Sequence, residues 1–197
     1  MKKILLSSMV LLLGTTLFAQ KTKTVTDENG KEVKLKNAYY ELVVNASVKE
    51  AWAALAQYGN VGDFHSGVSK SHYISDENLE MGCERYCEIP NGKKTINIKE
   101  RIVDIDQGTF YQYDVYEWEN FPLKKMLVTW GVKKNEKGQT VMYNSIDYRL
   151  KPGMLTGMMR GKMKKNARDG LISYKHHIET GESNVATKEL RKKYSEI

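Results

Sequence analysis

An arginine and a glutamate in two neighbouring predicted strands are the residues whose types and spacing most suggest chemistry. The pair Asn91-Gly92 predicts a two-residue turn between these strands, because both central residues of such a turn need positive φ. Residues directly opposite each other across the turn share one face of the sheet. The predicted register pairs Cys83 with Glu100, Arg85 with Ile98 and Cys87 with Ile96.

One face of this predicted hairpin is apolar except for the two charged side chains, and the other face is suited to solvent. Charges on an apolar face are typical of a cavity wall, where a few polar groups fix the orientation of a ligand. The arginine and glutamate either pair to order the wall or orient the polar head of a ligand, and the pairing of buried charges favours the first role. The apolar face consists of Cys83, Arg85, Cys87, Ile96, Ile98, Glu100 and Ile102.

Acid or base chemistry has two candidates, Glu100 and His65. His65 lies in a loop near the expected mouth of the cavity, where it is either a general base or a surface or hydrogen-bonding group. No nucleophile is identifiable near it, which favours the second role. The sequence has no nucleophile elbow, phosphate-binding loop or zinc signature. We therefore assign no catalytic residue and expect no cofactor.

The cysteines and the remaining histidines do not suggest a metal site. Cys83 and Cys87 lie in one predicted strand, roughly 13 Å apart at the strand rise, which is beyond the reach of a disulfide. We expect both to be free and buried thiols. His72 lies in another strand, and the adjacent His176 and His177 point different ways from a helix, so no metal cluster is expected.

A second predicted hairpin gives the same kind of face. Residues 135–138, Asn-Glu-Lys-Gly, suit a three-residue loop closed by a glycine in the left-handed region. One face of this hairpin is apolar except for Asn144. The predicted pairs are Val132 with Met142, Trp130 with Asn144, Val128 with Ile146 and Met126 with Tyr148.

The remaining elements follow from spacing and caps. Ser47 and Glu50 form a capping box that opens a helix ending at Gly59, and a short irregular or helical segment runs to Gly67. A long helix is predicted from Pro152 to Glu179, with apolar side chains at steps of three or four that must pack on the sheet. Strands are predicted at residues 39–44, 68–75, 83–89, 95–105, 110–117, 126–133 and 139–150.

Glycines and methionines are concentrated in the first turns of the long helix. Three glycines, at positions 153, 157 and 161, each cost roughly 1 kcal/mol in a helix. They allow either close contact between helix and sheet or room for a ligand. The neighbouring methionines, including Met158 and Met163, are flexible apolar linings that suit variable ligands and also fill ordinary cores.

The N-terminus has the pattern of an export signal. Residues 1–19 combine a basic start, an apolar run too short to span a bilayer and small residues before a cut near Gln20. No cysteine lies near the cut, so we expect no lipid anchor and a soluble periplasmic or secreted protein. We divide the mature chain into a polar arm at 20–37, one domain at 38–182 and a charged tail at 183–197.

The net charge of +7 falls to roughly +5 without the signal. The basic residues of the mature chain are concentrated near the long helix and in the tail. They are either solvated helix faces, the favoured interpretation, or a surface for an anionic partner. No recognised nucleic-acid motif accompanies them, so we expect no nucleic acid and at most weak contact with an anionic membrane.

The order of elements and several local patterns resemble the START-like, helix-grip superfamily, and within it the polyketide cyclase/dehydrase-like branch. Residues 44–52 pass from a strand through Ala-Ser into a helix with Val and Trp, and residues 82–85 and 99–101 match a Gly-x-x-Arg and a strand-borne Glu. Residues 58–68 resemble a segment ending Trp-His-Pro-x-Val, with Phe64 and Ser66 in place of Trp and Pro. The similarity spans about residues 39–182.

The resemblance implies an α+β helix-grip fold, in which a curved seven-stranded antiparallel sheet wraps a long C-terminal helix around a hydrophobic cavity. It does not fix one activity, because this fold serves carriers, sensors and a few enzymes. We expect a binder of a hydrophobic or amphipathic small molecule, the alternative being a cyclase/dehydratase that uses His65 or Glu100. The expected ligand-binding residues are Phe64, His65, Arg85, Glu100, Tyr113, Trp130, Asn144, Tyr148, Met158 and Met163.

Overall fold

The structure is a computed structural model that describes residues 22–27 and 29–197, so the predicted signal peptide and its cut lie outside the described residues. Within the described chain, one sheet of eight antiparallel strands has the order β1-β2-β8-β7-β6-β5-β4-β3. The strands are β1 (Lys23–Thr26), β2 (Glu32–Val44), β3 (Lys70–Tyr73), β4 (Glu84–Asn91), β5 (Lys94–Asp106), β6 (Phe110–Glu119), β7 (Leu123–Lys134) and β8 (Thr140–Leu150).

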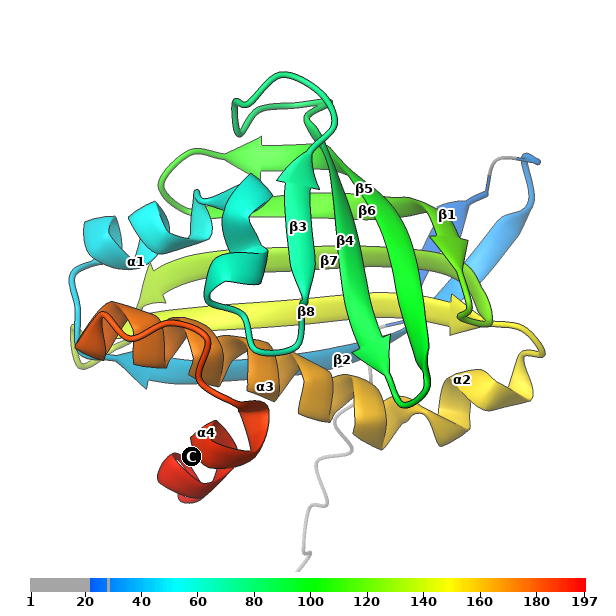
Figure 1. The fold of residues 1–197 in the computed structure, drawn as a ribbon. Helices are drawn as coiled ribbons and strands as arrows, with labels where there is room; N and C mark the ends of the chain where they lie inside the picture. Colours follow the sequence, from blue (N-terminus) through cyan, green and yellow to red (C-terminus); the bar gives the residue numbers. More distant parts are fainter. Residues whose placement is uncertain (1–21, 28) are drawn as a thin grey trace, which may run out of the picture.

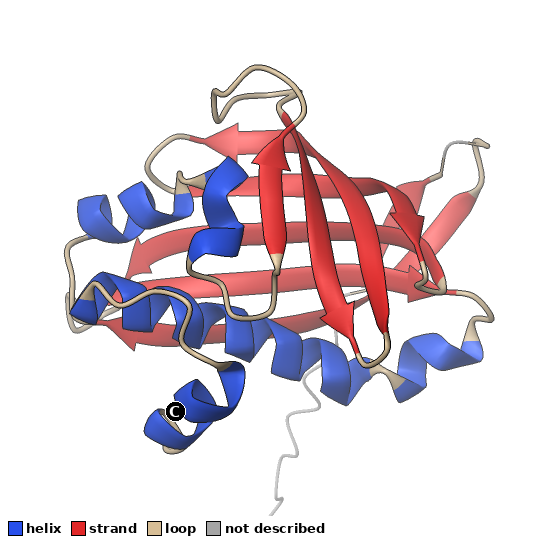
Figure 2. Ribbon diagram, in the orientation of Figure 1, coloured by secondary structure: helices blue, strands red, loops and turns tan. Residues whose placement is uncertain are grey.

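The helices gather on the inner side of this curved sheet (Figures 1 and 2). The long helix α3 packs against β2 and β8, and the tip of the β4–β5 hairpin reaches toward it. Two irregularities in the β5–β6 register bend the sheet where it turns toward α3, as bulges do. The helices are α1 (Val48–Leu55), the 3-10 helix η1 (Tyr58–Asp63), α2 (Met154–Met158), α3 (Arg160–Thr180) and α4 (Thr187–Lys193).

The predicted face of the β4–β5 hairpin is correct, but its register is displaced by two residues. The loop consists of Gly92 and Lys93, and only the glycine has positive φ, at 66°. A shift of two keeps every side chain on its predicted face, because side chains alternate with a period of two. The observed pairs are Arg85 with Glu100, Cys87 with Ile98 and Ile89 with Ile96.

The second hairpin has the predicted register in full. Gly138 closes the loop with φ of 74°, and Asn135 receives two backbone N–H donors on its side chain within the loop. The observed pairs include Val132 with Met142, Trp130 with Asn144, Val128 with Ile146 and Met126 with Tyr148.

The predicted polar arm at 20–37 is wrong for its described part. Residues 23–26 form β1, and β2 begins at Glu32 rather than at Tyr39, which makes the sheet eight-stranded instead of seven-stranded. Val33 and Leu35 are buried and pack with Leu127 in a small cluster separate from the main core. Their alternation with lysine and glutamate is the pattern of a half-buried strand.

The C-terminal part departs from the prediction in two places. The helix predicted at 152–179 is two helices, because α2 ends before Met159 and α3 begins after it. Residues 183–197, predicted as a tail outside the domain, contain α4, which packs on α3 through the buried side chain of Leu190. In the described part of the chain, no helix is long and apolar enough to cross a membrane.

Candidate ligand-binding cavity

A cavity of about 450 Å³ lies between the inner face of the sheet and α3, within the usual range for small-molecule sites. Strands β4 to β8, the loop after η1 and residues from α3 and α4 contribute to its wall. Most of the lining is apolar. The apolar lining includes Val61, Cys87, Ile89, Ile96, Ile98, Val115, Phe121, Leu123, Val128 and Ile146.

The mouth is marked by those lining residues that are also exposed to solvent. Pro90 and Asn91 belong to the tip of the β4–β5 hairpin, and Lys162 and Asn166 belong to the first turns of α3. Across this gap the Lys162 Nζ donates to Asn91 Oδ1 at 3.4 Å. The mouth therefore opens between the hairpin tip and α3, and one weak hydrogen bond spans it.

Arg85 and Glu100 form a salt bridge within the wall, directly opposite each other on β4 and β5. Their exposed fractions are 4% and 2%. Arg85 Nη1 also donates to the Tyr58 carbonyl at 2.7 Å, and its guanidinium lies 3.9 Å from the centroid of the Tyr58 ring. Burial raises the pKa of Glu100, and the charge of Arg85 opposes that rise. Because the Glu100 carboxylate balances the positive charge of Arg85 within the wall, the guanidinium is not an unpaired cation for a ligand.

Asn144 is the polar group that the wall leaves incomplete. Its side chain lies opposite Trp130 and is 1% exposed. The amide Nδ2 donates to the Thr129 carbonyl at 3.2 Å, which fixes the orientation of the amide. The buried Oδ1 has no hydrogen-bond partner among the described residues. A buried acceptor without a donor is costly, so a ligand that brings an O–H or N–H donor to this place would satisfy the Asn144 oxygen.

His65 follows η1 and enters the cavity beside Trp130 and Tyr174, with ring centroids 6.3 Å from each. The backbone N–H of Gly67 donates to His65 Nδ1 at 3.0 Å. The neutral ring therefore carries its proton on Nε2 and acts as a donor there. Burial lowers the pKa of His65 to about 4, although the residue as a whole is only half-buried.

A glycine on α3 makes room for these two rings. A Cβ at Gly170 would lie 2.6 Å from the Trp130 ring and 2.7 Å from His65 Nε2. By contrast, a Cβ at Gly161 would have no neighbour within 4 Å. The close contact between helix and cavity thus depends on Gly170, and the first three glycines of the predicted helix do not provide it.

The structure brings seven of the ten predicted site residues to the cavity and leaves three outside it. Phe64 packs against Tyr174 and stacks on His177, and Tyr148 donates its hydroxyl to the Thr156 carbonyl at 2.9 Å. Met158 lies on α2 with 72% of its side chain exposed. The seven lining residues are His65, Arg85, Glu100, Tyr113, Trp130, Asn144 and Met163.

Several lining residues were missed in the sequence. Tyr174 lies on α3, where the apolar spacing predicts packing on the sheet but no site, and Met159 lies where α2 and α3 meet. Asp169 and Arg191 close one side of the cavity with two hydrogen bonds of 2.9 and 2.5 Å between them. Arg191 belongs to α4, and no local sequence pattern places that helix on α3.

The cysteines are free, as predicted. Cys87 lies in β4 and lines the cavity, and Cys83 immediately precedes the strand; both are buried. Burial raises the pKa of the Cys87 thiol to about 11, so the reactive thiolate is scarce at neutral pH. Over the residues that the structure describes, no group of three or more His, Cys, Asp or Glu side chains could hold a metal ion.

Together, the curved sheet, the long helix and the apolar cavity between them define a helix-grip protein of the class that binds hydrophobic ligands. The family model described as polyketide cyclase/dehydrase and lipid transport matches residues 37–179. The chain belongs to this family. A search of curated proteins finds no match by sequence.

Solved structures show the same fold at low sequence identity. Ara h 8.0201 superposes with a TM-score of 0.60 at 14% identity, covering 73% of this chain and 97% of its own. The Zhui aromatase/cyclase from Streptomyces sp. R1128 gives 0.61 at 13% identity, covering 76% and 99%. The di-domain aromatase/cyclase StfQ of the steffimycin biosynthetic pathway gives 0.59 at 13% identity, covering 73% of this chain and 51% of its own.

Proposed function

We propose that this protein is an exported, soluble binding protein that holds an amphipathic small molecule, lipid-like or polyketide-like, with a neutral hydrogen-bond donor at its buried end. The observation that carries the proposal is the unpartnered Oδ1 of Asn144 in the wall of an otherwise apolar cavity. A hydroxyl is the simplest group that completes it, and the remaining apolar wall suits a hydrocarbon or ring system.

The charge balance of the wall favours a neutral buried group over a carboxylate. Arg85 is engaged by Glu100 and by the Tyr58 carbonyl, so it offers no unpaired positive charge. A carboxylate buried at Asn144 would lose its hydration and face an oxygen atom. An acid would keep its head at the mouth near Lys162, and its binding would then be insensitive to Asn144.

Binding is favoured over cyclase or dehydratase chemistry because neither candidate acid or base is free. Nδ1 of His65 is occupied by the Gly67 N–H, and Nε2 carries the proton, so no ring nitrogen accepts a proton from a ligand. Glu100 is held by the Arg85 guanidinium, which donates to its carboxylate in the buried salt bridge. Both groups are better suited to hold a ligand or the wall than to exchange protons with it.

Export is supported by the sequence of residues 1–19, which combines the basic, apolar and small-residue regions of a cleaved signal. The absence of a cysteine near the cut supports a protein without a lipid anchor. In the proposed role, the mature protein carries its ligand through an aqueous compartment outside the cytoplasm.

The test is titration of delipidated protein with hexadecanol, hexadecanoic acid and a sterol. The fluorescence of Trp130, which lines the cavity, monitors binding. Replacing Trp130 with Phe should remove the signal and thereby assign it. We expect hexadecanol to bind, and Asn144→Leu to weaken its binding about fivefold, the value of one hydrogen bond of roughly 1 kcal/mol.

The matched control is Gln112→Leu, which removes an amide from β6 outside the cavity lining, where it donates to Thr129 Oγ1. This control should leave the affinity unchanged. If none of the three ligands binds, the cavity is not a site for such ligands and the proposed function is wrong. If they bind but Asn144→Leu has no effect, the buried donor is wrong while hydrophobic binding stands.

A further inference from the structure

The short helix α2 presents two methionines to solvent beside the mouth of the cavity. Met154 and Met158 have exposed fractions of 75% and 72%, higher than any other large apolar side chain among the described residues. Both belong to the same five-residue helix, so they form one apolar tip. Core packing does not explain them, because neither is covered by the rest of the described chain.

The stretch of chain that contains this tip is basic and carries no acidic residue. Residues 148–168 contain seven basic residues and no Asp or Glu. The tip of the β4–β5 hairpin adds two exposed lysines. Among the described residues, no salt bridge neutralises Lys151, Arg160 or Lys162. The basic residues are Arg149, Lys151, Arg160, Lys162, Lys164, Lys165 and Arg168, with Lys93 and Lys94 on the hairpin.

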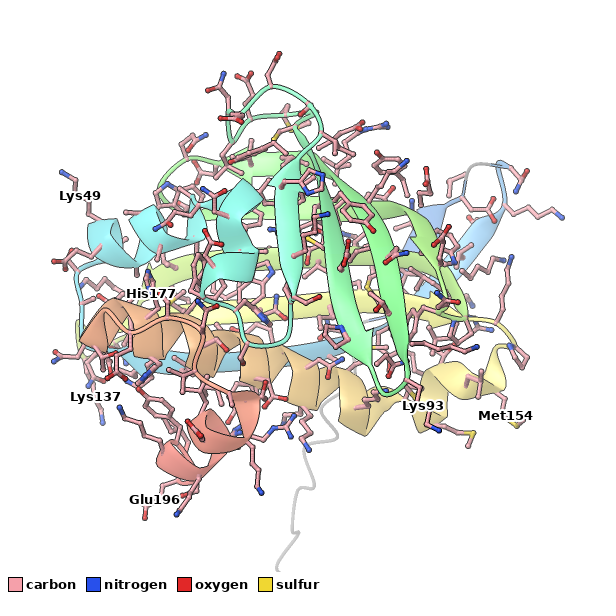
Figure 3. The ribbon with its side chains drawn as sticks, viewed as in Figure 1. Lys49, Lys93, Lys137, Met154, His177 and Glu196 are labelled. Atoms are coloured by element: carbon pink, nitrogen blue, oxygen red, sulfur yellow. The ribbon has the colours of Figure 1, made fainter. Side chains whose placement is uncertain are left out.

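The charged surface and the cavity mouth are continuous. Lys162 lines the cavity and bonds to Asn91 of the hairpin tip, and Met159 lines the cavity directly after α2. Figure 3 shows Met154 and Lys93 at the same end of the molecule, with Lys49 and Lys137 at the opposite end. We call the surface formed by Met154, Met158, Arg160, Lys162 and Lys93 the α2 rim.

We propose that the α2 rim docks on an anionic lipid surface and turns the cavity mouth toward it. The two methionines would enter the headgroup and acyl boundary, and the basic side chains would lie against the lipid phosphates. This arrangement would let a hydrophobic ligand pass between membrane and cavity with little exposure to water.

A lipid surface explains the α2 rim better than a nucleic acid does. Charge alone would suit either polyanion, but the most exposed part of the α2 rim is a pair of flexible apolar side chains. Single-stranded nucleic acids are usually held by stacking on aromatic rings, which the α2 rim does not offer. The inference goes beyond the proposed function, because docking can be measured on protein without a ligand.

The experiment is co-sedimentation of the delipidated protein with vesicles of phosphatidylcholine alone or mixed with phosphatidylglycerol. We expect binding to the anionic vesicles, weakened by added salt, and little binding to the neutral ones. The variant Met154→Ser/Met158→Ser should bind about tenfold more weakly. Lys93→Ser and Lys162→Ser should each lose about fivefold, because a basic residue near such a surface contributes roughly 1 kcal/mol.

Matched controls use the same substitutions elsewhere on the surface. Met81 is 60% exposed but lies in the loop before β4, and Lys49 and Lys137 lie at the end opposite Met154 in Figure 3. Met81→Ser and Lys49→Ser/Lys137→Ser should bind vesicles like the wild type. Equal losses in the rim and control variants would show non-specific charge attraction and overturn the proposal.

Two further outcomes would also overturn it. Binding to duplex DNA as tight as to the vesicles, with no effect of the methionine changes on either, would identify a general polyanion surface. A change in oligomeric state that disappears in Met154→Ser/Met158→Ser, without vesicle binding, would identify contact between copies of this chain. Failure of hexadecanol to bind in the earlier titration would leave the vesicle result standing, so the two proposals are tested separately.

Discussion

The Arg85–Glu100 salt bridge gives the sharpest prediction of stability. Both groups are nearly inaccessible to solvent and lie directly opposite each other in neighbouring strands. Replacing Glu100 with Leu leaves the guanidinium buried without a carboxylate, with the Tyr58 carbonyl and the rings of Tyr58 and Tyr113 as its partners. Such a stranded charge costs about 3–5 kcal/mol. Arg85→Met should cost a similar amount, because it strands the carboxylate.

The double variant Arg85→Met/Glu100→Leu should be more stable than either single variant. It removes both charges and fills their space with apolar groups, which often costs little in a buried site. The loss of the bond to the Tyr58 carbonyl leaves a net cost of about 1–2 kcal/mol. The two single losses together exceed this net cost by about 4–9 kcal/mol, so the double-mutant cycle should give a coupling of that size, far above the scatter of additive sites.

Urea unfolding followed by circular dichroism measures all four proteins. If a single variant fails to fold, the double variant should still fold, so the comparison keeps its outcome. A double variant destabilised by the sum of the two single losses would refute the pairing. Hexadecanol binding to the double variant separates the two roles of the pair: a wall role predicts affinity within about threefold of the wild type, and an orienting role predicts its loss.

Two further predictions concern the contact between α3 and the cavity. Gly170→Ala should destabilise the protein by about 1–2 kcal/mol and change Trp130 fluorescence, because overpacking against the ring outweighs the helix propensity of alanine. Gly161→Ala should instead stabilise it by about 0.5–1 kcal/mol, and thermal or urea unfolding measures both changes. If both changes have the same sign, the close contact is absent. The pKa of His65 is lowered to about 4 in the folded protein, so below pH 6.5 the unfolded chain binds a proton more readily than the folded one. The free energy of unfolding should therefore fall by up to about 3 kcal/mol as the pH drops from about 6.5 to about 4. His65→Gln should flatten this part of the pH–stability curve measured by urea unfolding, and an unchanged slope would contradict the buried neutral ring.

The faces of the strands were predictable because turns and alternation are local. Gly138 and Gly92 marked both hairpins, and a period of two kept Arg85 and Glu100 on the inner face although the first register was displaced by two residues. The displacement itself left no trace in the polarity pattern. Asn-Gly suits a turn at either of two positions, and the pleat gives both the same inner face.

The direction of side chains outside regular elements was less predictable. Phe64 and His65 are adjacent in the segment after η1, yet Phe64 packs on His177 while His65 enters the cavity. Hydrophobicity alone would have reversed them. Met158 lies off the buried face of α3. The helix is interrupted at Met159, and α2 does not continue that face.

Long-range packing supplied the parts of the site that no local pattern contained. Arg191 reaches the cavity because α4 folds back onto α3, where Arg191 pairs with Asp169. The basic composition of residues 183–197 does not indicate this packing. Gly170 lies far along α3 from the three glycines at positions 153, 157 and 161. The positions of Trp130 on the facing strand β7 and of His65 after η1 show why a glycine is needed there.

Native mass spectrometry of the protein purified from its own host, compared with the variant Ile98→Trp, tests the central claim most directly. Ile98 lines the cavity, so a tryptophan there would occupy part of its volume of about 450 Å³. The account predicts a wild-type chain that begins near Gln20 and carries a small hydrophobic molecule, released on denaturation, and a variant without it. Spectra in which both proteins are bare, or in which both carry the same molecule, would contradict a ligand-holding cavity.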